Sequence, residues 1–198
     1  MRSGSALSFV LFSAAIAVGC SPSPPATAQV NSSTVSGTVG SSALTVTSVV
    51  AEFVNFFPTA GGPPVPALRI LFSNKANTCG GIHFASSTFL DVRLVAVSPV
   101  HAGTFPIENA ANQTPADGQA EADFDSVDGA CNGVVTQAAT TGSLTIKGAH
   151  FSASPLNVAG SIDVTFAGGH FSGDFNASYC GMNGADGPDA GAITTCTQ

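Results

Sequence analysis

Residues 158–179 read VAGSIDVTFAGGHFSGDFNASY, and this stretch predicts a β-hairpin. Apolar or small residues alternate with polar residues in its first half, and the same alternation resumes in its second half. A period of two is typical of strands that bury one face. The pair Gly168-Gly169 is suited to a tight two-residue turn. That turn would place Phe166 opposite Phe171 and would match apolar or small residues along the whole buried face.

The same register would place Asp163 directly opposite Asp174 on the outer face of the hairpin. Like charges at that spacing destabilise a sheet. We expect solvent and a neighbouring cation to offset this repulsion, with Lys147 on the preceding strand as the candidate cation. A divalent cation bound between the two carboxylates is the alternative.

Alternating segments separated by Gly, Pro and Asn extend over most of the chain. No stretch combines helix formers with a 3.6-residue period over more than two turns. The sequence therefore predicts an all-β protein, and we expect a single antiparallel β-sandwich of about eight to ten strands. One of these strands, over residues 43–57, changes its alternation near Ser48, which predicts a β-bulge there.

Acidic residues concentrate between positions 117 and 128, where the chain carries Asp117, Glu121, Asp123, Asp125 and Asp128. Calcium prefers several carboxylate and carbonyl oxygens, but the spacing of an EF-hand loop is not met. We interpret the segment as an exposed acidic edge, with a calcium site as the alternative. On an earlier strand, Asp91 and Arg93 are likewise expected on an exposed outer face, where an ion pair contributes about 0–1 kcal/mol.

The composition narrows the possible functions. The chain has 198 residues, 12 Asp and Glu, and 5 Lys and Arg, for a net charge of −7, which argues against nucleic acid as a partner. It contains no G-x-S-x-G, no H-E-x-x-H and no phosphate-binding glycine loop. His150 and His170 occupy similar contexts, GAHFS and GGHFS, which favour surface positions at strand starts over a metal pair. We therefore expect no enzyme activity, no cofactor and no metal.

The N-terminus has the features of an export signal. Arg2 precedes an apolar segment of 13 residues, ALSFVLFSAAIAV, which is too short to span a bilayer as a helix. The following AVGC ends at Cys20 and resembles the lipobox of bacterial lipoproteins, although Ala17 stands where that motif usually has Leu. The resemblance implies cleavage before Cys20 and lipid attachment to its sulfur. Cleavage after Ala28, in an A-x-A sequence, is the alternative and would release a protein without lipid.

The C-terminal GSIDVTFAGGHFSGDF and the early GTVGSSALTV also resemble segments of uncharacterised small all-β bacterial lipoproteins. That family brings no known activity. The resemblance implies several acyl chains on Cys20, palmitate among them, and Ser21 after the cysteine favours the outer membrane. We therefore expect a lipid-anchored, monomeric outer-membrane lipoprotein of structural or interaction type, whose protein or glycan partner the sequence does not identify. A ligand- or carbohydrate-binding surface module, similar to an adhesin, is the alternative.

The predicted organisation is a signal peptide at residues 1–19, a Ser/Pro-rich tether at 20–36 and a β-domain at 37–198. Lipidation of Cys20 would leave four cysteines in the β-domain: Cys79, Cys131, Cys180 and Cys196. An even number in an exported chain favours two disulfides, with three possible pairings. We prefer Cys79–Cys131 and Cys180–Cys196, since the second pair would close a Gly- and Asp-rich tail. No C-x₂-C spacing supports a zinc site.

Overall fold

The computed structural model describes residues 32–56, 63–76, 83–95, 100–109, 115–150, 156–186 and 196–197. Of residues 56, 83–84, 181–186 and 196–197 it describes the backbone alone. The predicted signal peptide and Cys20 lie outside these ranges. Within them, there is no helix of the length and apolarity needed to cross a membrane.

The described part of the chain is all-β, as the alternation predicts, and it contains strands but no helix. The strands are β1 (Ser32–Ser33), β2 (Ser36–Val39), β3 (Ser42–Thr45), β4 (Ser48–Phe56), β5 (Val65–Ser73), β6 (His83–Phe84), β7 (Thr88–Val95), β8 (Gly103–Ile107), β9 (Ala120–Val127), β10 (Gly133–Ala138), β11 (Thr141–His150), β12 (Asn157–Phe166), β13 (Gly169–Asp186) and β14 (Cys196–Thr197). Strands β14 and β6 form a separate two-stranded sheet, and the other twelve belong to one sheet.

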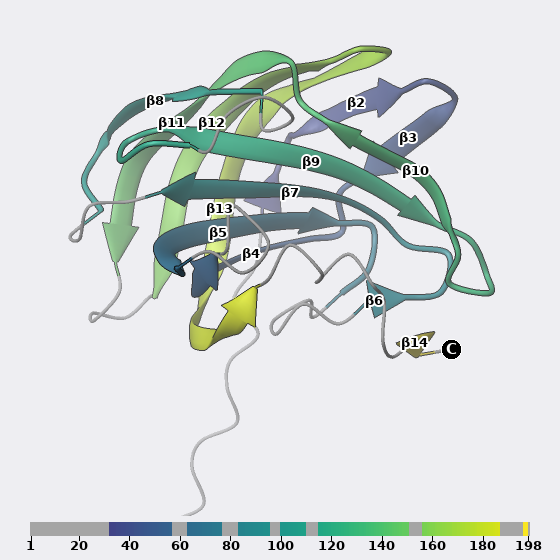
Figure 1. Ribbon diagram of the computed structural model, residues 1–198, viewed down its shortest axis with the longest axis horizontal. Coiled ribbons are helices and arrows are strands. Elements are labelled where there is room, and N and C mark those ends of the chain that lie inside the picture. Colours follow the sequence, from purple (N-terminus) through teal and green to yellow (C-terminus); the bar gives the residue numbers. More distant parts are fainter. Residues whose placement is uncertain are drawn as a thin grey trace, which may run out of the picture.

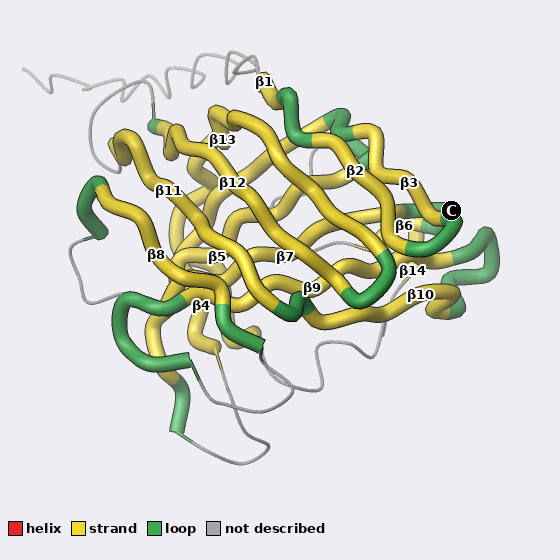
Figure 2. The backbone as a smooth tube through the Cα atoms, turned by 90° about the horizontal axis from the view of Figure 1, so that it is seen from above, coloured by secondary structure: helices red, strands yellow, loops and turns green. Residues whose placement is uncertain are grey.

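The large sheet closes on itself, which corrects the expected sandwich of two separate sheets. Its strands follow the order β12-β11-β8-β9-β7-β5-β4-β13, and β13 also pairs with β12. These eight strands therefore form a barrel, with β2, β3, β1 and β10 as additions to its wall. Figure 1 shows β8, β11 and β12 arching over β5 and β4, and Figure 2 shows the wall from above.

Strand β13 closes the barrel because its two edges have different partners. One edge pairs with β12 from Gly169 to Ser178. The other edge pairs antiparallel with β2 and β1, and then parallel with β4 from Ser178 to Asp186. A second parallel contact joins β8 to β9, at Ile107 and Ala120. The sheet is therefore mixed, and the expectation of purely antiparallel pairing is wrong at these two junctions.

The β12–β13 hairpin forms with the predicted faces but in a different register. The turn is Ala167-Gly168, and Phe166 lies opposite Gly169 instead of Phe171. The shift is an even number of residues, so every side chain stays on its predicted face. The buried side chains of this hairpin are Val158, Ile162, Val164, Phe166, Phe171, Phe175 and Ala177.

The observed register places large side chains opposite small ones. Ile162 faces Gly173, and Phe175 faces Gly160. A Cβ atom at Gly160 would lie 2.7 Å from the ring of Phe175 and 2.1 Å from the carbonyl oxygen of Thr145, so no other residue fits without movement. The interior of an eight-stranded barrel is narrow, and alternating large and small side chains fill it.

Aromatic rings from opposite walls meet inside the barrel. Phe124 of β9 stacks on Phe171 of β13, with ring centroids 5.3 Å apart, and meets Phe166 edge-on at 6.2 Å. Phe72 of β5 meets Phe175 edge-on at 5.4 Å. Phe72, Phe124 and Phe171 are fully buried. These contacts join the β5–β9 side of the wall to the hairpin.

Two details near the N-terminus differ from expectation. The change of alternation near Ser48 is a break between β3 and β4 at residues 46–47, instead of a bulge within one strand. The segment predicted as a tether extends into the barrel, because β1 pairs with β13 and Thr34 donates its backbone N–H to the carbonyl oxygen of Asp174 at 2.9 Å. The last residues of the predicted tether, from Ser32 onward, are thus part of the wall.

Replacing Phe124 with Ala should lower the free energy of unfolding by about 3–5 kcal/mol, because it leaves a cavity between two walls. Urea unfolding monitored by circular dichroism measures the change. Val134→Ala is the control: Val134 is 62% exposed, and we expect a change within about 0.5 kcal/mol. A loss below about 1 kcal/mol for Phe124→Ala would mean that the barrel interior is not close-packed at this point.

Candidate functional site

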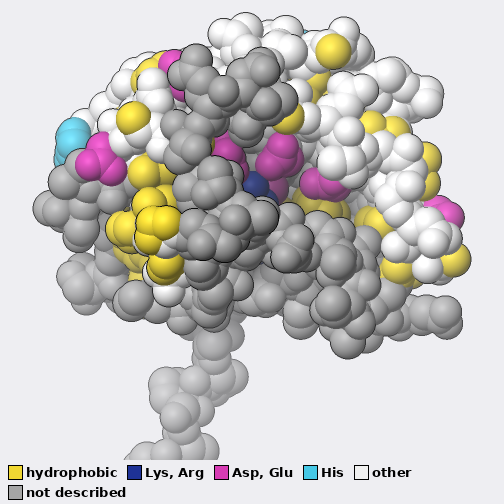
Figure 3. Space-filling model, in the orientation of Figure 1, with side chains coloured by type: hydrophobic (Ala, Val, Ile, Leu, Met, Phe, Trp, Pro, Cys, Tyr) yellow, Lys and Arg dark blue, Asp and Glu magenta, His cyan; other side chains and the backbone are white. Residues whose placement is uncertain are grey.

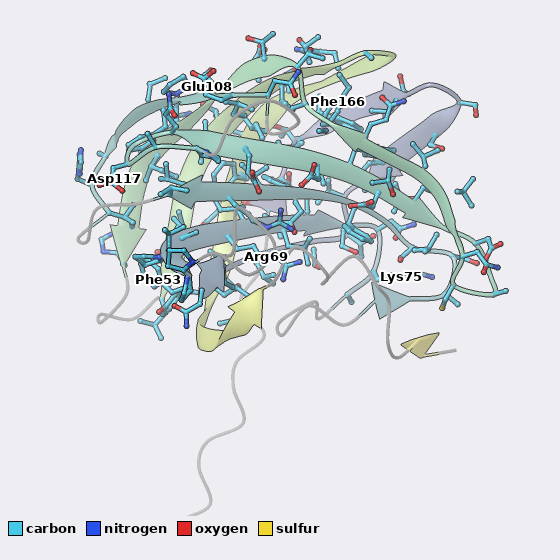
Figure 4. The ribbon with its side chains drawn as sticks, in the orientation of Figure 1. Phe53, Arg69, Lys75, Glu108, Asp117 and Phe166 are labelled. Atoms are coloured by element: carbon cyan, nitrogen blue, oxygen red, sulfur yellow. The ribbon has the colours of Figure 1, made fainter. Side chains whose placement is uncertain are left out.

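Six charged side chains form a continuous network on the outer face of β4, β5, β7 and β9. We call this network the charge ladder; it consists of Glu52, Arg69, Asp91, Arg93, Glu121 and Asp123. Strand pairing places Glu52 opposite Arg69, Arg69 opposite Arg93, and Arg93 opposite Glu121. Figure 4 labels Arg69 beside the middle of β5.

Arg69 connects the first three strands of the ladder. Its Nε donates to both carboxylate oxygens of Asp91 at 3.1 Å, and its Nη2 lies 3.0 Å from Asp91 Oδ2. Its Nη1 donates to Glu52 Oε1 at 3.3 Å. This fork geometry is the one in which guanidinium groups bind carboxylates most strongly.

Arg93 connects β7 to β9. Its Nη2 donates to Asp91 Oδ2 at 2.6 Å, so that Asp91 bridges the two arginines. Its Nη1 donates to Glu121 Oε1 at 2.9 Å and to Asp123 Oδ2 at 3.1 Å. The two guanidinium groups lie on neighbouring strands, and the bridging carboxylate offsets their repulsion.

The charge ladder is covered, unlike an ordinary outer face. Glu52, Asp91 and Glu121 are exposed by 1%, 2% and 4%, and Arg69 by 6%. Buried apolar side chains flank the ladder on both sides of the same face: Val50, Leu71, Phe89 and Val127 on one side, and Val54, Ala67 and Val95 on the other. Figure 3 shows acidic and basic side chains together in a hollow on this face, with apolar side chains nearby.

Burial changes proton binding in the ladder, where four carboxylates share two guanidinium groups. Burial raises the pKa of Glu121 to about 7, against the opposing attraction of Arg93. Burial likewise raises the pKa of Asp123 to about 6. On the adjoining part of β9, burial raises the pKa of Asp125, while a 2.7 Å hydrogen bond from Thr136 Oγ1 opposes that change. The ladder therefore takes up protons near neutral pH.

The sequence prediction placed several of these residues in the wrong environment. Asp91, Arg93, Glu121, Asp123 and Asp125 were expected on exposed faces, but Asp91 and Glu121 are buried and the other three are partly buried. Alternation identifies the outward face of a strand, but it cannot show whether a second layer covers that face. Glu52 and Arg69 were not predicted at all. Their signal is that β5, VPALRILFS, is apolar on both faces around Arg69, as in strands buried on both sides.

The acidic segment does not gather into one site. Asp117 lies well away from Arg69 in the view of Figure 4. Asp128 is a partly exposed turn residue: its Oδ1 accepts hydrogen bonds from the backbone N–H of Asn132 at 2.9 Å and of Ala130 at 2.8 Å, and these bonds lower its pKa. In the part of the chain with described side chains, no group of three or more His, Cys, Asp or Glu could hold a metal ion.

The predicted opposition of Asp163 and Asp174 is wrong. The register shift places Ser172 opposite Asp163 and Ser161 opposite Asp174. Each carboxylate then has its own partner: Lys147 Nζ binds Asp174, and His170 Nε2 lies 3.1 Å from Asp163 Oδ1. Lys147 is the cation that the sequence indicated, but it acts on one carboxylate alone.

Two of the four predicted disulfide cysteines lie among the described side chains. Cys131 follows the Asp128 turn with a φ of 64°, and Cys180 packs against the apolar cluster that contains Val50 and Leu71. Both are disulfide-bonded. Cys79 and the side chain of Cys196 lie outside the described residues, so the preferred pairing stays a prediction.

The geometry of the charge ladder is that of a structural network. Each of its described carboxylates is held by at least one guanidinium group, and each guanidinium group binds two or more carboxylates. Such pairing links the outer faces of the four neighbouring strands. A comparison with protein-family models, curated proteins and solved structures finds no match to this chain.

Arg69→Met should lower the free energy of unfolding by about 3–5 kcal/mol, because it leaves Glu52 and Asp91 buried without this cation. Lys147→Met is the matched control, since it breaks a pair whose side chains are 56% and 67% exposed and should cost less than about 1 kcal/mol. Denaturant unfolding of both variants at pH 8 makes the comparison. Equal losses of unfolding free energy in the two variants would contradict the burial of the charge ladder.

Stability should fall as pH rises from about 4.5 to about 7. Over that range Glu121 keeps its proton in the folded state but loses it in the unfolded state. The folded state therefore loses, as pH rises, the stabilisation that it gains from binding this proton, which amounts to about 2–4 kcal/mol of unfolding free energy. Glu121→Gln should flatten this pH dependence and leave the protein at least as stable as the wild type at pH 8. Asp117→Asn, which removes an exposed acid outside the ladder, should retain the wild-type slope. Urea midpoints between pH 4.5 and 8 provide the measurement, and a wild-type stability that rises over this range would refute the assignment.

Proposed function

We propose that the protein is a lipid-anchored outer-membrane lipoprotein of non-catalytic, structural or interaction type. In this proposal Cys20 carries the acyl chains, and the barrel is the folded module that they hold at the membrane. In this proposal the module acts through its outer surface, because the described side chains of its interior pack against one another.

The observation that carries this proposal is the filled interior of the barrel. Eight-stranded barrels either fill their interior with side chains or hold one small ligand there. Here Phe72, Phe124 and Phe171 are fully buried, and rings from opposite walls are in contact. A barrel whose interior is filled in this way supports a function at its outer surface, in contact with other molecules. It argues against a ligand bound in the interior.

A ligand- or carbohydrate-binding surface module receives less support. Such a site needs an exposed apolar or aromatic platform beside a few polar groups. Among the side chains that the structure describes, the exposed large apolar ones are Val134 and Leu156, and no aromatic ring is among them. The outer faces of β11 and β12 carry mainly polar side chains beside the small Ala159, and they offer no such platform.

The start of the barrel fits a short connection to the membrane. The first described strand, β1, begins at Ser32, twelve positions after Cys20. A chain of that length spans at most about 40 Å when fully extended. An acylated Cys20 would therefore hold the start of the barrel within about 40 Å of the lipid surface, which suits contact with partners in or near that membrane.

Cys20→Ser should abolish both lipid attachment and membrane association when the chain is produced in a bacterium that processes lipoproteins. The wild-type protein should fractionate with membranes and should show the added mass of acyl chains on a peptide that begins at Cys20. Several acyl chains together make such an anchor long-lived. Membrane fractionation followed by intact-mass analysis reads both properties.

The matched control is Ala28→Gln, which removes the small residue needed for cleavage after position 28. If Cys20 is the processing site, Ala28→Gln behaves as the wild type. A mature protein that begins at Gln29, carries no lipid and is no longer processed in Ala28→Gln would overturn the proposal.

A further inference from the structure

Strand β10 has an open edge. It pairs with β9 along one side, and no other described strand pairs with its opposite side. Figure 2 shows it at the periphery of the molecule, outside β9. An edge strand presents a row of backbone N–H and C=O groups that can pair with another chain.

The edge lacks charged residues and proline, two of the usual protections against such pairing, and its pairing with β9 is regular from Val135 to Ala138, beyond the β-bulge at Val134. Natural edge strands carry Lys, Pro or inward-pointing charges that prevent association. The sequence of β10 is GVVTQA, with no charged residue and no proline. A register shift between Gly133 and Val135 leaves Val134 as an extra residue, and at 62% it is the more exposed of the two exposed large apolar side chains in the described part of the molecule.

We propose that β10 is a pairing surface for a second copy of this chain. Two copies related by a two-fold axis perpendicular to the sheet would pair their β10 strands antiparallel and continue the sheet from one barrel into the other. With Thr136 on the axis, Val134 of each copy lies beside Ala138 of the other. The apolar and neutral side chains then meet each other across the junction.

The charges around β10 favour a copy of the chain over a charged partner. Two copies of an acidic protein with a net charge of −7 repel each other least where they meet through an uncharged surface, and β10 is such a surface. The nearest acids on β9 are already held: Asp123 by Arg93 at 3.1 Å and Asp125 by Thr136 at 2.7 Å. The β9 strands of two copies would lie three strand spacings apart, about 14 Å, which exceeds the Debye length at physiological salt.

The test compares Val134→Lys with Leu156→Lys in the full-length protein, purified in a mild detergent. Both variants replace an exposed apolar side chain with Lys and change the net charge equally, and both keep the native N-terminus. We expect the wild type and Leu156→Lys to form dimers at concentrations up to about 1 mM, more strongly as salt increases. Val134→Lys places a charge beside its own copy and should weaken the dimer by about tenfold or more.

Sedimentation equilibrium gives the dissociation constants, and amide hydrogen exchange locates the contact. In the wild type, amides of β10 should exchange more slowly at high concentration than at low concentration, and Val134→Lys should remove this difference while keeping the wild-type thermal unfolding. A wild type that stays monomeric, including one that instead binds an extended peptide from another protein, overturns the proposal. Equal dimerisation of Val134→Lys and Leu156→Lys also overturns it.

Discussion

The structure depends on the pairing of β13 with different strands along its two edges. Because β12 occupies one edge while β2, β1 and β4 share the other, the sheet must close instead of ending. Closure confines the interior, and a confined interior demands that each large side chain face a small one. The opposition of Phe175 and Gly160 meets that demand, and so does the opposition of Ile162 and Gly173.

Closure also determines where the charged residues lie. One face of β4, β5, β7 and β9 is directed into the barrel, and the opposite face carries the charge ladder between two apolar clusters. Buried ion pairs add little net stability relative to apolar packing, but they strongly disfavour arrangements that separate them. The contacts of Arg69 and Arg93 span four neighbouring strands, so a two-residue slip that preserved every face would still leave carboxylates buried without a cation. The ladder thus disfavours such slips among β4, β5, β7 and β9.

Local sequence patterns determine part of this fold, and tertiary packing determines the rest. Alternation identified the strands and the buried face of the β12–β13 hairpin, because a side-chain period of two is a local property. It could not determine the register, because Phe166 keeps its face whether it lies opposite Gly169 or Phe171. It also could not predict closure, which requires two strands far apart in the sequence, β4 and β13, to pair. Asp91 and Asp123 were predicted to be exposed for a related reason. Whether the outward face of a strand is buried depends on tertiary packing, which alternation does not report.

The long-range pairing of the first strands has a consequence for biogenesis. Thr34 bonds to Asp174 across 140 residues of sequence, and β4 has no neighbour on one edge until the C-terminal part of β13 arrives. Contacts between distant parts of a chain form slowly, and unpaired edges promote aggregation in the meantime. During synthesis, which starts at the N-terminus, β4 therefore keeps one unpaired edge until almost the whole chain has been made. Chaperones that bind extended chains with unpaired strand edges would have their longest opportunity to bind this protein before β13 is synthesised.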